Sequence, residues 1–214
     1  MAKIKLILST IIFFIFCNTQ SYGQWENYNT ENSSLPDNHV YSLALDLKNN
    51  IWMSTYEGIA KFDGYENWTI YDTLSSDIPT NNTCAIAIDK DDVLWSSSNG
   101  GNSAFSFDGV TWELFKTEDF EVSHFCASDI EFDFLNRPLY ATSRFVKYLD
   151  NDKWIEVPHA PDVTGFSDVN SVEEDMNNEI WLATETEGVL NISNAKLTKF
   201  KTDNSEIPTN RIAS

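Results

Sequence analysis

Aromatic residues recur along this chain at an interval of about 43 residues, and no other sequence feature restricts the possible folds as strongly. One series consists of Trp25, Trp68, Trp112 and Trp154, and is continued by Leu197. A second series consists of Trp52, Trp95, Tyr140 and Trp181. Since every tryptophan belongs to one of the two series, the chain is expected to be an array of similar units.

Three positions after each member of the first series stands an aromatic or aliphatic residue. These partner residues are Tyr28, Tyr71, Phe115, Val157 and Phe200. Between the two series lie short segments rich in aliphatic residues and bounded by Asp, Asn or Gly, which is typical of short β-strands. In the first unit the predicted strands are residues 40–45, 51–55, 59–62 and 68–71.

Turn-forming residues separate these strands. Asp46-Leu-Lys-Asn-Asn50 and Asp175-Met-Asn-Asn178 are predicted hairpin loops, because Asp and Asn tolerate left-handed backbone and bond their own main chain. Gly58 supplies a positive φ at the next hairpin. Asp63-Gly64 and Asp108-Gly109 predict two-residue type I′ turns. Three hairpins of this kind join four antiparallel strands in each unit.

A four-stranded unit of this length predicts an all-β fold, the β-propeller, in which each unit is one four-stranded blade. The predicted units are about 25–67, 68–111, 112–153 and 154–196, with the start of a next unit at 197–214. Together, residues 24–214 are expected to form a partial propeller with four full blades, an N-terminal outer strand at Trp25–Tyr28 and the start of a fifth blade. A four-bladed ring with surplus ends is the alternative. The residues assigned a structural role between the sheets are Trp52, Trp68, Trp95, Trp112, Trp154 and Trp181.

Residues 1–23 have the pattern of a cleavable signal peptide. Lys3 and Lys5 precede the apolar run Leu6–Phe16, which is short for a membrane span, and the small residues Ser21 and Gly23 precede the expected cleavage site. An uncleaved anchor is the alternative. We expect export to the periplasm or the extracellular space, with no transmembrane segment in the mature chain.

Two cysteines remain after the signal peptide, Cys84 and Cys126. An oxidising compartment would allow them to pair, but two cysteines do not make a disulfide framework. The favoured interpretation is a pair of small buried hydrophobic residues.

The chain is strongly acidic, with 14 Lys and Arg against 33 Asp and Glu and a net charge of -19. This balance argues against a nucleic-acid partner, because affinity for phosphate comes from clustered basic residues. A hydrophobic share of 42% is nevertheless ample for a packed core.

The string Ser33-Ser-Leu-Pro-Asp-Asn38, followed by residues 40–46, 50–55 and 58–64, resembles the two-component regulator propeller repeat. That family forms extracytoplasmic propellers in bacterial sensors, often ahead of a membrane helix and a histidine kinase. The resemblance implies a ligand-sensing propeller. Because the sequence stops where a fifth blade has barely begun, we expect the chain to be a fragment of such a sensor. The third unit departs from the repeat, with Tyr140 interpreted as the replacement for tryptophan.

No nucleophile, base and orienting group stand at the spacing of a catalytic motif, so the chain is expected not to be an enzyme and to use no metal or cofactor. Binding candidates are instead the variable residues that follow a repeated Pro-x-Asn or interrupt the third unit. These are His39, Asn82, His124, Arg144 and Arg211. They are expected at one mouth of the propeller, where they would meet a small-molecule or oligosaccharide ligand.

Three functions remain open on the sequence. The first is the sensor propeller, with its missing blades supplied by downstream sequence or by self-association. The second is a secreted binding or adhesion propeller without a signalling output. The third, ranked last, is an exported enzyme such as a lyase or glycosidase on a propeller.

Overall fold

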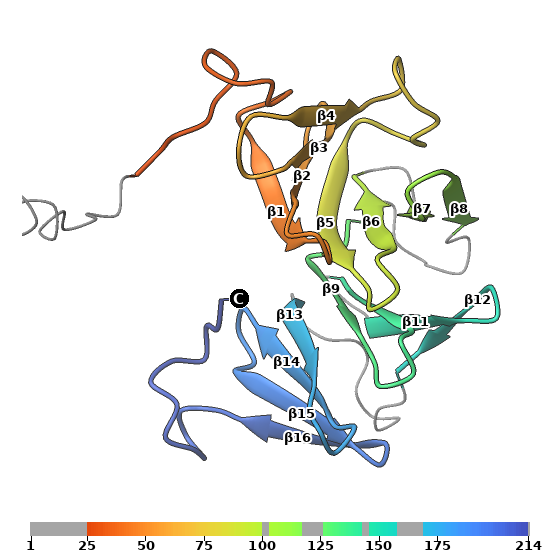
Figure 1. The fold of residues 1–214 in the computed structure, drawn as a ribbon. Coiled ribbons are helices and arrows are strands. Elements are labelled where there is room, and N and C mark those ends of the chain that lie inside the picture. Colours follow the sequence, from red (N-terminus) through yellow and green to blue (C-terminus); the bar gives the residue numbers. More distant parts are fainter. Residues whose placement is uncertain (1–24, 100–102, 117–125, 143–145, 158–168, 214) are drawn as a thin grey trace, which may run out of the picture.

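The computed structural model describes residues 25–99, 103–116, 126–142, 146–157 and 169–213, which form sixteen strands arranged as four sheets, or blades (Figure 1). Blade 1 contains β1 (Val40–Leu45), β2 (Ile51–Thr55), β3 (Gly58–Phe62) and β4 (Trp68–Tyr71). Blade 2 contains β5 (Thr83–Ile88), β6 (Leu94–Ser98), β7 (Ser103–Phe107) and β8 (Trp112–Lys116). Blade 3 contains β9 (Asp129–Phe132), β10 (Pro138–Ala141), β11 (Val146–Asp150) and β12 (Lys153–Glu156). Blade 4 contains β13 (Val169–Glu174), β14 (Ile180–Thr184), β15 (Val189–Ser193) and β16 (Lys196–Phe200).

Within each blade the strands pair in chain order and antiparallel. The first strands, β1, β5, β9 and β13, lie toward a common centre, and successive blades follow one another around it (Figure 1). This arrangement confirms the predicted all-β propeller of four-stranded blades. The strand bounds predicted for the first unit differ from those observed by one residue, at the start of β3.

The hairpin between the first and second strands is built identically in the four blades. Each begins at an aspartate whose Oδ1 accepts the backbone N–H of the residue four positions later, at 2.8 to 3.0 Å. The aspartates are Asp46, Asp89, Asp133 and Asp175. The residue three positions after each aspartate has a positive φ of 60° to 66°, as predicted for the two loops named above.

The hairpin between the third and fourth strands differs from the prediction. Asp63 and Asp108 do not start two-residue turns, because β3 and β4 are separated by residues 63–67 and β7 and β8 by residues 108–111. Their carboxylates accept several backbone N–H groups of these longer loops. Two-residue turns with positive φ at both positions occur instead at residues 151–152 and 194–195, in blades 3 and 4.

An aromatic stack joins the second and fourth strands in blades 1, 2 and 4. The stacked pairs are Trp52 with Tyr71, Trp95 with Phe115 and Trp181 with Phe200, and their ring centroids lie 5.3 to 5.7 Å apart. Each tryptophan also donates its indole N–H to Oδ2 of the hairpin aspartate six residues earlier, at 3.1 to 3.2 Å. The repeated tryptophan is therefore fixed by stacking and by one hydrogen bond.

Blade 3 lacks this stack, and the position predicted for its second-strand aromatic residue is wrong by one. The residue six positions after Asp133 is Leu139, which pairs with Tyr148 across the strands just as Trp52 pairs with Lys61. Tyr140 lies one position further and so faces the opposite side of the sheet, where its hydroxyl donates to the carbonyl of Ser96 in blade 2, at 3.0 Å.

Apolar side chains fill the spaces between neighbouring blades. Trp52 of blade 1 packs in a cluster with Ile86, Leu94 and Phe107 of blade 2. Leu139 packs in the corresponding cluster between blades 3 and 4, which includes Val172 and Leu190. The core is thus a series of apolar clusters between neighbouring sheets.

Cys84 and Cys126 form a disulfide, with Cα atoms 5.7 Å apart. The interpretation of two separate buried residues is therefore wrong. Cys84 lies in β5, and Cys126 precedes β9, so the bond joins blade 2 to the segment that leads into blade 3. Strand positions along the chain do not reveal how closely two neighbouring blades approach, which is why spacing did not predict the pairing.

The predicted N-terminal outer strand at Trp25–Tyr28 is not formed in this structure. An added outer strand would have to pair with the free edge of a third strand. Each of the four sheets already has its fourth strand at that edge. Trp25 is fully exposed. Tyr28 instead contacts the rings of Phe62 and Trp68 on the outer face of blade 1, with centroids 5.1 and 5.7 Å apart. The predicted signal peptide lies outside the described residues.

Candidate functional site

The loops that lead into the first strands, here called approach loops, are held by a repeated hydrogen bond. In the three such loops that carry Pro-x-Asn, before β1, before β5 and after blade 4, the side-chain carbonyl of the asparagine accepts a backbone N–H from the start of the loop, at 2.7 to 2.9 Å. The donors and acceptors are Thr30 with Asn38, Thr73 with Asn81, and Thr202 with Asn210. The asparagine therefore shapes the loop, and only the residue after it is left to vary.

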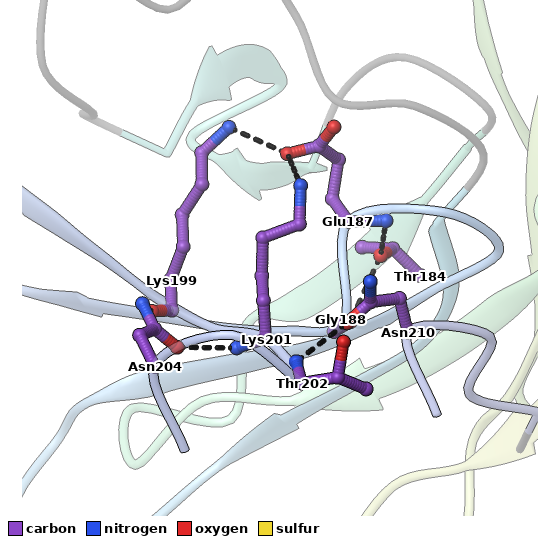
Figure 2. A network of polar contacts seen from close by, with 8 residues as sticks. All are labelled: Thr184, Glu187, Gly188, Lys199, Lys201, Thr202, Asn204 and Asn210. Carbon is purple, nitrogen blue, oxygen red and sulfur yellow. Dashed lines mark hydrogen bonds and ion pairs between the residues drawn. The ribbon is translucent and has the colours of Figure 1, made fainter. Parts of the chain in front are cut away.

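The approach loop that follows blade 4 also bonds back to that blade (Figure 2). The backbone N–H of Gly188, in the hairpin between β14 and β15, donates to the carbonyl of Asn210 at 2.9 Å. Beside it, Glu187 accepts hydrogen bonds from Lys199 at 2.8 Å and from Lys201 at 3.2 Å. These two lysines hold the pKa of Glu187 below its usual range, so the carboxylate stays ionised.

The structure places three of the predicted binding residues directly after an approach-loop asparagine. His39 is exposed, and its Nδ1 lies 3.0 Å from the carboxylate of Asp37. Arg211 is also exposed, and its Nε donates to Glu185 at 2.7 Å. The bonds of both side chains thus go to near neighbours, and no ion pair or hydrogen bond links them to each other among the described residues. His124 and Arg144 lie outside the described residues.

Asn82 differs from these two residues because its side chain is half-buried and incompletely bonded. Its Oδ1 atom is buried, and no hydrogen-bond donor within the described residues reaches it. Its backbone N–H and carbonyl are engaged, with Thr80 and Asn99. Buried polar atoms almost always have a partner, so an acceptor left unpaired within the described residues is unusual.

The rest of the described chain offers no metal cluster and no membrane helix. No group of three or more His, Cys, Asp or Glu side chains could hold a metal ion among the described residues. No helix in that part of the chain has the length and hydropathy needed to cross a bilayer.

The fold of this chain is that of a β-propeller, and several solved structures are similar to it. The extracellular domain of a putative hybrid two-component system from B. thetaiotaomicron matches 92% of this chain with a TM-score of 0.69 and 19% identity. Virginiamycin B lyase from Staphylococcus aureus matches 79% with a TM-score of 0.61 and 15% identity. A gluconolactonase from Xanthomonas campestris matches 83% with a TM-score of 0.58 and 12% identity.

These similarities concern the fold. This chain covers 27% of the sensor domain, 56% of the lyase and 65% of the gluconolactonase, and so spans less than two thirds of each. No protein-family model matches the chain. No curated protein matches it either.

The expectation that the chain is not an enzyme is overturned by these comparisons. A lyase and a gluconolactonase share its propeller fold, so the repeat and its architecture do not exclude catalysis. The earlier inference depended on the absence of a short sequence motif. Such a motif is not required in a propeller, where side chains from several blades meet at one mouth.

Proposed function

We propose that the chain is the ligand-binding propeller of an extracytoplasmic sensor of the two-component type, and that it binds a small molecule or an oligosaccharide at the approach-loop mouth. The observation that carries the proposal is the buried Oδ1 of Asn82, which no hydrogen-bond donor of the described residues reaches. A carbonyl in this position accepts a hydrogen bond from a ligand hydroxyl or amide, or from a water that a ligand displaces.

His39 and Arg211 extend this site as exposed polar side chains at equivalent positions of the repeat. The side chains of His39, Asn82 and Arg211 differ in chemistry, although the loops that carry them are alike. Such a design separates the framework from recognition, as is common where loops on a rigid scaffold bind ligands. The similarity to an extracellular sensor domain over 92% of the chain supports the sensing role, and the disulfide supports an oxidising compartment.

We further propose that additional blades cover the open face of blade 1. Leu43 and Leu45 are 64% and 62% exposed there. The equivalent residues of blade 2, Ile86 and Ile88, pack in the cluster around Trp52 of the preceding blade. Trp181 of blade 4 would cover a following blade in the same way. The added blades come from downstream sequence, with self-association as the alternative outcome.

Ligand binding is tested by thermal-shift measurements of the purified chain against a panel of mono- and oligosaccharides and small metabolites. A true ligand raises the unfolding midpoint in proportion to the logarithm of its concentration above Kd. We expect the rise to be lost in Asn82→Ala and reduced in Arg211→Ala. It should persist in Asn177→Ala, an exposed asparagine at the opposite end of blade 4. A ligand whose effect survives both mouth substitutions would contradict the proposed site.

The sensor assignment is tested in the source cell with an antibody against residues 25–213. A band far larger than 24.4 kDa in the membrane fraction supports it. A band near this size, soluble outside the cytoplasm, would contradict it.

The proposal that further blades cover the open face of blade 1 is tested by maleimide labelling of Leu43→Cys in the native protein, with Tyr65→Cys as the exposed control. Equal labelling of both would contradict a covered face.

A further inference from the structure

Blade 3 lacks both rings of the aromatic stack that the other three blades share. Leu139 stands where the second strand carries tryptophan elsewhere, and Val157 stands where the fourth strand carries Tyr71, Phe115 or Phe200. Two aliphatic side chains therefore occupy the place of an indole and a second ring. Because they are smaller than the two rings of the other blades, they leave part of the space between neighbouring blades unfilled.

A cavity of about 270 Å³ lies at this place, between blades 3 and 4. Its apolar wall includes Leu139 and Val157 together with Tyr148, Ile180 and Ile192. The volume lies just below the range of about 300–1,000 Å³ that is usual for small-molecule pockets, so it suits a ligand with one ring system. The cavity lies at the end of the first strands that is opposite to the approach loops.

The rim of the cavity is charged. Asp133, Arg137 and Glu174 line it. In the other blades a tryptophan N–H donates to Oδ2 of the hairpin aspartate. In blade 3 Arg137 supplies the donors instead, because its Nε and one terminal nitrogen each lie 2.6 Å from Oδ2 of Asp133. Its guanidinium also lies 4.0 Å above the centre of the Tyr148 ring, and its other terminal nitrogen is 3.4 Å from Asp150. Arg137, the one cation among the described residues of the rim, is thus already paired with two carboxylates.

Glu174 is the second carboxylate that lines the rim. Its Oε2 accepts the backbone N–H of Phe134 at 2.9 Å. Burial raises the pKa of Glu174, and the charges of Asp133 and Asp175 add to the rise, whereas the hydrogen bond from Phe134 and the charge of Arg137 oppose it. A cation seated beside Glu174 would favour its ionised form.

The link between hairpins has been rearranged at the same place. In blades 1 and 2 the backbone N–H after the hairpin aspartate donates to the positive-φ residue of the next blade, Asp92 or Asn136. In blade 3 the corresponding N–H of Phe134 donates to Glu174 instead, and the positive-φ residue Asn178 lines the cavity. The cavity is therefore accompanied by a changed hydrogen-bond pattern at its rim.

We propose that this cavity is a binding site for a small aromatic amine, with the ring stacked in the place of the missing rings and the ammonium group beside Glu174. The apolar wall of five side chains favours the ring, and the excess of carboxylates at the rim favours a cation over a neutral or anionic substituent. The site is independent of the approach-loop mouth, so it stands or falls separately from the proposed sensing site.

Fluorine NMR with para-fluorophenethylamine tests the proposal directly. The fluorine resonance of the amine is expected to broaden and shift when the protein is added. The neutral para-fluorotoluene and the anionic para-fluorophenylacetate should bind at least about tenfold more weakly. In protein with labelled isoleucine methyl groups, the ligand ring should give intermolecular NOEs to Ile180 and Ile192. Absence of binding, equal binding of the neutral analogue, or NOEs elsewhere would each overturn the proposal.

Variants that fill the cavity with a larger side chain, or that remove the charge of Glu174, provide the second test. Leu139→Trp and Val157→Phe restore residues that the other blades carry, and each is expected to weaken amine binding by at least about tenfold. Glu174→Gln should reduce the preference for the amine over para-fluorotoluene by about tenfold. Glu173→Gln, with the same charge change on the opposite face of β13, is the matched control and should bind as the native chain does. If a refilled variant fails to fold, the NOEs in the native protein decide the matter.

Discussion

The indole N–H of Trp52 donates a hydrogen bond of 3.1 Å to the carboxylate of Asp46, which stands six residues earlier at the start of the same hairpin. The same carboxylate accepts from the side chain of Asn50 at 2.6 Å and pairs with Lys61 at 3.1 Å. Lys61 also lies 4.7 Å above the indole. One buried aspartate thus ties the turn, the second strand and the third strand of blade 1 together.

Replacing Trp52 with Ala should lower the free energy of unfolding by about 3–5 kcal/mol, because the side chain is only 5% exposed and fills the space between blades 1 and 2. Urea titration followed by circular dichroism measures the change. Trp181→Ala is the matched control in the same chain, since Trp181 is half-buried and has no following blade in this structure to pack against. Equal losses in the two variants would contradict the packing assigned to Trp52.

Asp46 should make the fold sensitive to acid. Burial by itself would raise the pKa of Asp46, but the donors on Asn50, Trp52 and Lys61 together hold it well below its usual range. Because the folded pKa lies below the unfolded value of about 3.9, this stabilisation is present above about pH 4 and is lost as the pH falls below it.

Asp46→Asn should therefore destabilise the chain at neutral pH by about 1–3 kcal/mol, and its difference from the native chain should narrow between about pH 5 and pH 2. Urea titrations across this range give the comparison. Asp203→Asn, on an exposed turn, is the charge control. A difference that does not vary with pH would show that Asp46 acts without its charge.

Reduction of the disulfide between Cys84 and Cys126 should lower the free energy of unfolding by about 2–4 kcal/mol. The bond closes a loop with a sequence separation of 42 and so restricts the unfolded chain. Urea titrations with and without a reductant measure the loss. The double variant Cys84→Ser and Cys126→Ser should be as weak as the reduced chain and should not respond to the reductant; a response would mean that the reductant acts elsewhere.

Gly58→Ala should be more harmful than Gly64→Ala although both glycines have a positive φ, of 128° and 82°. A Cβ atom on Gly58 would lie 2.5 Å from the backbone carbonyl of Tyr71, whereas one on Gly64 would meet nothing within 4 Å. We expect a loss of about 1–2 kcal/mol for Gly64→Ala from backbone strain alone, and a clearly larger loss for Gly58→Ala. Thermal unfolding of the two variants decides this, and similar midpoints would refute the role of the close contact.

The repeat in the sequence was sufficient to predict the sheets of the fold, because hairpin aspartates and alternating apolar residues act locally. The predicted bounds of β1, β2 and β4 match those observed. The third unit was misaligned because its aromatic residue, Tyr140, was matched to tryptophan by chemical likeness. Counting six residues from Asp133 leads to Leu139 instead, and the structure follows the hairpin.

The site was less accessible to sequence reasoning than the fold. The positions after Pro-x-Asn could be named from the repeat, but the unbonded carbonyl of Asn82 depends on how the approach loop packs in three dimensions. The cavity between blades 3 and 4 had a partial signal, since Val157 already interrupted the series of partner aromatics. Its second half, Leu139, was hidden by the misalignment. The pairing of Cys84 with Cys126 depends on the distance between blades, which the sequence does not contain.

The bonds between blades 1 and 4 and the segments that follow them bear on how such a chain grows by gene duplication. Thr83, at the start of β5, donates its hydroxyl to the carbonyl of Thr55 in the preceding blade, and Ile212 donates its backbone N–H to the carbonyl of Thr184, the residue equivalent to Thr55 in blade 4. A duplicated segment that ended with the fourth strand would leave these carbonyls without donors. The smallest insertion that adds a blade with all these carbonyls hydrogen-bonded therefore contains one sheet, the approach loop that follows it and the first residues of the next strand. The duplicated sequence unit is thus shifted along the chain relative to the sheet.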